Sequence, residues 1–145
     1  MSFLQVLLSG VIAGVILLQA TIVAPVLFKN LSAKDAGPVL RAIFPRLFGL
    51  AFAFGLLALV VSVADNQGLI PKAVFLFTVV AMAICYLIIP ATNSAKDAGN
   101  EGAFKKLHTL SVVLTMIVLI TNITCLLYTS PSPRDRTRSR MPSSA

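Results

Sequence analysis

Long apolar runs alternate with short polar connections along the chain. Residues 1–28 contain no Asp, Glu, Lys or Arg, and three further runs without these residues follow. A helix of about 20 residues crosses the roughly 30 Å hydrocarbon core of a bilayer. The pattern therefore predicts an all-α membrane protein, a bundle of four transmembrane helices within residues 1–124. The predicted spans are residues 3–28, 47–64, 73–90 and 107–124 or beyond.

The connection after the first run carries signals for local structure. Pro25 lies in the last turns of that run and predicts a kink or an end of the helix. Ser32 and Asp35 have the spacing of a capping box, which favours a helix start. The apolar positions that follow have helical spacing, so we expect a short interfacial helix from about Ala36 to Phe44, ending where Pro45 resets the chain.

Small residues mark two helix faces that allow close packing. Gly10 and Gly14 are four residues apart in the first run, as are Ala51 and Gly55 in the second. Small residues at this spacing let the backbones of membrane helices approach each other. We therefore expect the two surfaces to face each other.

The hexapeptide Ser-Ala-Lys-Asp-Ala-Gly occurs twice, at residues 32–37 and 94–99. Each copy follows a span and a proline, and the second of these prolines, Pro90, predicts the end of the third span. Two interpretations remain open. Either the protein is a duplicated helical hairpin, with halves related by an axis along the membrane normal, or two short polar loops have converged on common residues.

Composition and charge place the protein in a membrane and orient it. With 57% hydrophobic residues, the chain has too few polar groups to cover a soluble globule, so lipid must cover the rest. Its basic residues lie in short gaps between apolar runs, a distribution typical of topology signals and not of nucleic-acid binding. The three connections carry four, one and three basic residues in chain order. The positive-inside rule then places the first and third connections in the cytoplasm.

This predicted topology also indicates the membrane and the orientation of the protein. We predict a multi-pass protein of the plasma membrane, specifically a bacterial inner membrane, with its N-terminus outside. The expected partners are the lipid bilayer and either a second copy of the chain or another membrane protein, without nucleic acid.

Residues 125–145 differ in composition from the rest of the chain. The run from Cys125 to Asp135 resembles a translation of the transposon adapter used in sequencing libraries. After three variable residues, the closing Ser-Arg-Met-Pro-Ser-Ser-Ala continues the same adapter in the same frame. We therefore expect residues 125–145 to be a non-native tail and give them no functional weight.

Polar side chains on the fourth span share one helical face. They are His108, Ser111, Thr115 and Asn122. One interpretation is hydrogen bonding between helices. The other is a site for a proton, a metal or a polar solute, because an ionisable group inside a membrane is a functional hypothesis by default.

The predicted topology brings further polar groups to the same depth. Gln19, Cys85 and Tyr86 share the cytoplasmic half of the membrane with His108 and Ser111, so one pocket could form among them. We call the following five residues the candidate polar cluster: Gln19, Tyr86, His108, Ser111 and Thr115. His108 is the only histidine, which excludes bis-His haem ligation and a multi-His metal site within one protomer. We expect no metal, no cofactor and no catalytic residue.

Residues in the first and third connections resemble a known family. They are Phe28, Leu31, Ala36, Gly37, Phe44, Pro45 and Phe48 in the first, and Pro90, Asn93, Asp97, Phe104, Leu107, His108 and Ser111 in the second. Over about residues 5–124 the chain resembles the uncharacterised membrane family typified by transmembrane protein 205, also called domain of unknown function 4149. The resemblance implies four transmembrane helices and supplies no activity. The candidate loop motifs are Phe44, Pro45, Pro90, Asn93 and Asp97.

Three classes of function remain open at this level. The first is a structural or partner-binding role through the cytoplasmic loops. The alternative is handling of a small solute, a proton or a metal through the candidate polar cluster. An enzyme is the third, and it has the least support because no nucleophile, base and orienting carboxylate occur together.

Overall fold

The structure, a computed structural model, describes residues 3–66 and 68–129. Its elements in chain order are α1 (Phe3–Leu18), the π-helix η1 (Gln19–Val23), α2 (Ala24–Asn30), α3 (Ala33–Ala64), α4 (Leu69–Leu87), α5 (Ile89–Asp97) and α6 (Glu101–Thr129). Within these residues, four helical stretches are long and apolar enough to cross a membrane: Phe3–Asn30, Lys34–Ala64, Leu69–Asp97 and Glu101–Leu127. The prediction of an all-α four-helix membrane bundle is confirmed.

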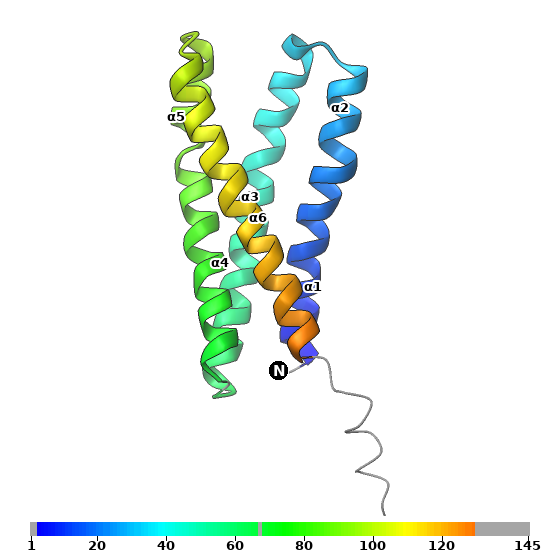
Figure 1. The fold of residues 1–145 in the computed structure, drawn as a ribbon, viewed down its shortest axis with the longest axis vertical. Helices are drawn as coiled ribbons and strands as arrows, with labels where there is room; N and C mark the ends of the chain where they lie inside the picture. The colour runs from blue at the N-terminus through cyan, green and yellow to red at the C-terminus, as the bar shows by residue number, and fades with distance from the viewer. Residues whose placement is uncertain (1–2, 67, 130–145) are drawn as a thin grey trace, which may run out of the picture.

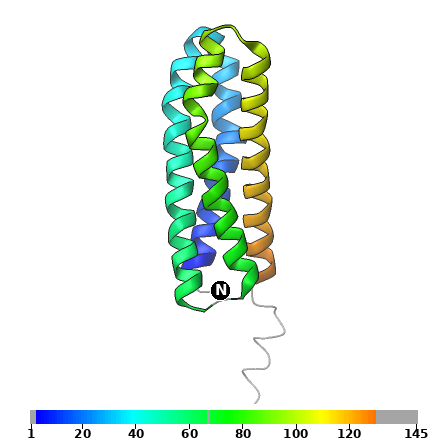
Figure 2. The ribbon, with the colours of Figure 1, turned by 90° about the vertical axis from the view of Figure 1, so that its left-hand side faces the viewer.

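The helices pack in a cyclic order. α1 contacts α3 and α6, and α4 contacts α3 and α6, so each long helix has two neighbours. Successive spans run in opposite directions (Figures 1 and 2). The α2–α3 and α5–α6 connections therefore meet at one end, which we call the loop end, and the α3–α4 connection lies at the other, which we call the turn end (Figure 1).

The core draws side chains from all four spans. Its largest cluster is formed by Ile12, Ala13, Ile16, Leu47, Phe48, Ala51, Ala81, Met82, Cys85, Val118 and Leu119. Large aliphatic side chains also cover the outer surface, for example Leu17, Val60, Leu76 and Ile120. A helix that is apolar on every side belongs in a membrane, because lipid solvates its outer face.

α3 is a single helix, which corrects the prediction of a separate interfacial helix over residues 36–44. It runs from Ala33 to Ala64 through Pro38 and Pro45. Each proline removes one backbone donor, but packing along α4 and α1 holds the remaining turns in line. Neighbouring helices compensate for proline in this way inside membrane bundles.

Pro25 and Pro90 lie next to helix irregularities. Pro25 directly follows the π-helical turn η1, which Ala24 closes by donating its backbone N–H to the carbonyl of Gln19. Before Pro90, α4 ends at Leu87 and α5 begins at Ile89, with the proline in its first turn. The predicted disturbances therefore occur, each starting a few residues ahead of the proline.

The first copy of the repeated hexapeptide begins a helix. Leu31 is extended, and Ser32 occupies the N-cap of α3. The Ser32 hydroxyl accepts a hydrogen bond from the backbone N–H of Asp35 at 3.2 Å and donates to the Asp35 carboxylate at 2.6 Å. The predicted capping interaction is present.

The second copy ends a helix. α5 is already running when the chain reaches Ser94, and Gly99 terminates it with a positive φ of 67°, a conformation that glycine adopts without strain. The N–H of Gly99 donates to Lys96 and that of Asn100 to Ala95, which is a Schellman motif. The two identical segments thus have inequivalent structures, and this favours convergence over a duplicated hairpin.

The small residues do not pair as expected. Gly10 and Gly14 have open space where a Cβ would lie, whereas a Cβ on Gly55 would lie 2.9 Å from Cγ2 of Thr78. Gly55 is therefore packed against α4, whereas Ala51 lies in the core cluster that also contains Ile12 and Ala13 of α1.

Candidate functional site

A polar seam joins α6 to α4 in the interior of the bundle. Asn122 and Thr78 are fully buried, and Asn122 Nδ2 donates to Thr78 Oγ1 at 3.0 Å and to the carbonyl of Val118 at 2.9 Å. Among the described atoms, Asn122 Oδ1 has no hydrogen-bond partner. The bond between Asn122 and Thr78 joins two helices, as the interpretation of the polar face of the fourth span as hydrogen bonding between helices predicts.

The seam continues toward the loop end. Thr115 Oγ1 donates to the carbonyl of Ser111 at 2.7 Å, and Ser111 Oγ donates to the carbonyl of Leu107 at 3.3 Å. Cys85 lies against this pair, with its sulfur 3.8 Å from the Ser111 carbonyl oxygen. Both hydroxyls thus donate to their own helix, as Ser and Thr commonly do in membrane helices.

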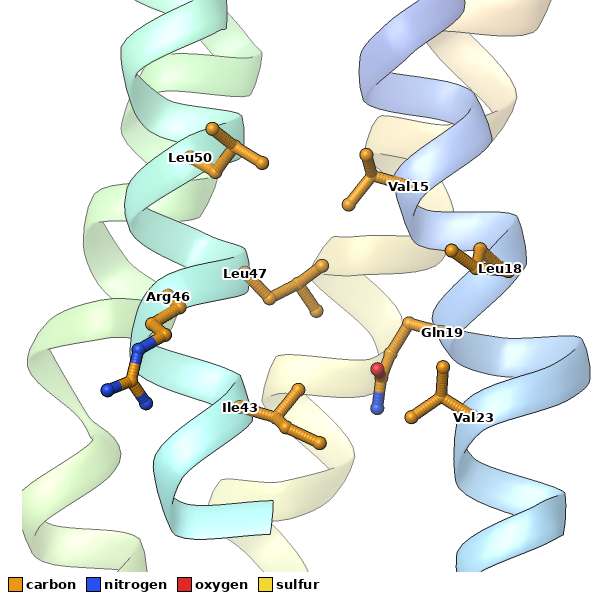
Figure 3. Close-up of a pocket in the computed structure, with 8 residues that line it drawn as sticks. All are labelled: Val15, Leu18, Gln19, Val23, Ile43, Arg46, Leu47 and Leu50. Atoms are coloured by element: carbon orange, nitrogen blue, oxygen red, sulfur yellow. The ribbon is translucent and has the colours of Figure 1, made fainter. Parts of the chain in front are cut away.

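The remaining members of the candidate polar cluster lie elsewhere. The Tyr86 side chain is 50% exposed on the outer surface. His108 is exposed, and its ring stacks on that of Phe104 with centroids 5.6 Å apart. Gln19 lines a cavity between the first span and α3 (Figure 3). The structure therefore brings Ser111 and Thr115 together and leaves the other three residues apart.

Of the candidate loop motifs, Asp97 forms the strongest contact. Arg41 donates to the two Asp97 carboxylate oxygens through both terminal nitrogens, with Nη1 3.0 Å from Oδ2. This bidentate pair links α3 to α5. The α4–α5 stretch is about 44 Å long at 1.5 Å per residue, so Asp97, its last residue, lies beyond the hydrocarbon core. Hydrogen bonding to Arg41 lowers the pKa of the Asp97 carboxyl.

The other loop motifs have structural surroundings. Phe44 stacks on Phe48 with ring centroids 5.7 Å apart, against the main core cluster. Pro45 is half-buried within α3, Pro90 is exposed in the first turn of α5, and Asn93 is half-buried one turn later.

A second group of contacts orders the α5–α6 connection. Lys96 Nζ lies 3.4 Å from a carboxylate oxygen of Glu101 and 4.9 Å from the centroid of the Phe104 ring. Asn100 Oδ1 accepts from the backbone N–H of Ala103 and so caps α6. The basic side chains of the loop end are therefore displayed on a fixed framework.

A lateral cavity of about 250 Å³ lies between the first span and α3. Its lining residues are Val15, Leu18, Gln19, Val23, Ile43, Arg46, Leu47 and Leu50 (Figure 3). Gln19 is only 9% exposed. Its amide points into the space between the two helices, while the Arg46 guanidinium points away from that space (Figure 3).

The π-helical turn η1 positions the Gln19 side chain in the wall of this cavity. η1 begins at Gln19 and ends at Val23, and both residues line the cavity. A π-turn inserts one extra residue into the helical ladder, and such turns recur at functional sites. The irregularity ahead of Pro25 thus coincides with the one buried amide in the cavity wall.

Sequence reasoning missed three of these residues. Thr78 is isolated in an apolar run, so the sequence does not indicate that it faces Asn122. The charge pattern uses Arg41 and Arg46 as topology signals and does not indicate that one pairs with Asp97 and the other borders the cavity. The position of Arg46 directly before the charge-free second run was the available signal for a side chain at the membrane boundary.

Four apolar helices, with buried polar contacts between α4 and α6, define this chain as a small multi-pass membrane protein associated with the lipid bilayer. The domain of unknown function (DUF4149) matches residues 7–101, and the chain belongs to this family. The narrower likeness to transmembrane protein 205 remains a prediction, and His108 and Ser111 lie outside the matched range. No curated protein and no solved structure matches the chain.

Proposed function

We propose that the chain is a non-enzymatic component of the plasma membrane that binds an acidic surface of a partner membrane protein through its loop end. The observation that carries this proposal is the charge asymmetry of the bundle. The basic residues at the loop end are Lys29, Lys34, Arg41, Arg46, Lys96, Lys105 and Lys106, all of them exposed. Three acidic residues, Asp35, Asp97 and Glu101, accompany them, which leaves a surplus of four positive charges.

The order of the loop end supports a binding role. The Ser32 cap, the Arg41–Asp97 pair and the Lys96 contacts hold both connections in defined conformations. A preorganised surface binds with less loss of conformational entropy than a mobile one. The same surplus of positive charge favours the cytoplasmic side, with the N-terminus outside.

Zero-length carbodiimide crosslinking in native membranes tests this proposal, because it joins a lysine amine directly to a carboxylate that it touches. We expect Lys34 and Lys105 of the full chain to be joined to Asp or Glu residues of one partner protein. The double variant Lys34→Glu/Lys105→Glu should lose at least about 10-fold in crosslinking yield, since it removes both reacting amines and turns attraction into repulsion at two sites.

Lys72→Glu is the matched control, because Lys72 lies at the turn end near the start of α4. It should leave the crosslinking yield unchanged. Both Lys34 and Lys72 lie in the first turns of their helices, where a carboxylate is favourable, so loss of the fold does not explain a difference between the variants. An equal loss in Lys72→Glu, or crosslinks that do not involve the loop end, would overturn the proposal.

A further inference from the structure

The cavity between the first span and α3 has a mostly apolar wall that contains two polar side chains. Six of its lining side chains are aliphatic, and only Gln19 and Arg46 are polar. A bound water molecule needs two to four polar partners, and most of this wall offers none. The cavity is therefore suited to hydrocarbon that carries a hydrogen-bond acceptor.

The Gln19 amide provides a buried donor with which a hydrogen-bond acceptor of the ligand can pair. This side chain is 91% buried at 9% exposure, and its Nε2 has no hydrogen-bond partner in the part of the chain that the structure describes. A buried amide donor without a partner costs free energy, and an acceptor entering the cavity would remove that cost.

Arg46 lines the cavity with part of its side chain and carries an exposed positive charge beside it. Its Nη1 donates to the carbonyl of Ala42 at 2.6 Å, and a guanidinium has four further N–H donors. Because Arg46 directly precedes the charge-free run 47–64, it lies where the hydrocarbon meets the headgroups. Basic sites between membrane helices at this level are complementary to anionic lipid headgroups.

We infer that this cavity binds one anionic phospholipid. The aliphatic walls hold a segment of an acyl chain, an ester carbonyl oxygen accepts from Gln19 Nε2, and the phosphate pairs with Arg46. The volume of about 250 Å³ accommodates only this part of the lipid, and the rest lies in the surrounding bilayer. This site lies on the side of the bundle and goes beyond the proposed binding of a protein at the loop end.

Native mass spectrometry of the full chain, purified in a neutral detergent, tests the inference. The protein is incubated with phosphatidylglycerol or with phosphatidylcholine, and the fraction carrying one lipid is measured. We expect phosphatidylglycerol to bind about 10-fold more tightly than phosphatidylcholine, a preference in the range of one charge-assisted hydrogen bond.

Three variants assign the binding to the cavity. Arg46→Gln should abolish the preference for phosphatidylglycerol, and Gln19→Leu should weaken both lipids by about 2- to 10-fold, the range of one hydrogen bond. Val15→Phe fills the cavity from its wall and should weaken both lipids while the protein stays folded. Lys72→Gln removes a basic charge at the turn end and should change nothing.

Several outcomes would overturn the inference. They are equal binding of the two lipids by the wild type, an unchanged preference in Arg46→Gln, an equal loss in Lys72→Gln, or unaltered binding in both Gln19→Leu and Val15→Phe. Lipid-free dimers that Val15→Phe converts to monomers would assign the cavity to a second copy of the chain. The loop-end crosslinks form through Lys34 and Lys105 and not through Val15, Gln19 or Arg46, so each proposal can fail without the other.

Discussion

Gly55→Ala tests the closest approach between helices in the bundle. A Cβ at this position would lie 2.9 Å from Thr78 Cγ2, closer than van der Waals contact allows. Thr78 cannot rotate away freely, because its Oγ1 donates to the carbonyl of Val74 at 2.9 Å and accepts from Asn122 at 3.0 Å. The substitution must therefore either separate α3 from α4 or break the hydrogen bonds of Thr78.

The expected magnitude comes from comparison with a glycine in open space. Gly14→Ala meets no atom within 4 Å, so it should gain about 1 kcal/mol of helix propensity. Gly55→Ala gains the same propensity but pays for overpacking, which typically amounts to about 1–3 kcal/mol. The free energy of unfolding of Gly55→Ala should therefore lie about 1–3 kcal/mol below that of Gly14→Ala.

The assay uses the buried thiol of Cys85. Cys85 is buried, so a thiol-reactive dye labels it when the helices separate in increasing SDS. The double variant Gly55→Ala/Thr78→Ser provides the rescue, because serine keeps the hydroxyl and lacks the clashing methyl group. Equal unfolding midpoints for Gly55→Ala and Gly14→Ala, or a rescue variant no more stable than Gly55→Ala, would refute this packing argument.

Three further predictions concern the seam, the ion pair and the topology. Asn122→Ala should destabilise the bundle by about 0.6 kcal/mol, the average for hydrogen bonds between membrane helices, measured by the same SDS titration. Asp97→Asn should be slightly less stable than wild type at pH 7. Because the pKa of Asp97 is lowered in the folded protein, this difference should be present above the ordinary carboxyl pKa and vanish as the pH falls through the lowered value. Finally, Lys105→Cys should be protected from a membrane-impermeant maleimide in intact cells, and Asp65→Cys should be labelled; the reverse pattern would invert the topology.

The sequence determined the membrane character and the number of spans of this protein. Apolar runs of 18 residues or more have few alternatives in a bilayer, where backbone groups must be satisfied within each helix. Capping signals were also readable, because the interaction of Ser32 with Asp35 spans only one helical turn. Such local interactions depend on residues that are close in the chain.

The tertiary structure decided which faces meet. The spans are apolar on every side, so their periodicity does not distinguish the core face from the lipid face. For this reason Gly55 was expected against α1 but packs against Thr78, and the partner of Asp97 proved to be Arg41, 56 residues away.

Context also decided the role of identical residues. Ser32 follows an extended residue and starts α3, while Ser94 lies inside a helix that had already begun near Pro90. The cavity beside Gln19 likewise depends on the spacing of two helices that are joined only through the loop end. Helix packing, which acts between residues distant in the chain, determined these features because no local pattern encodes the partner of each side chain.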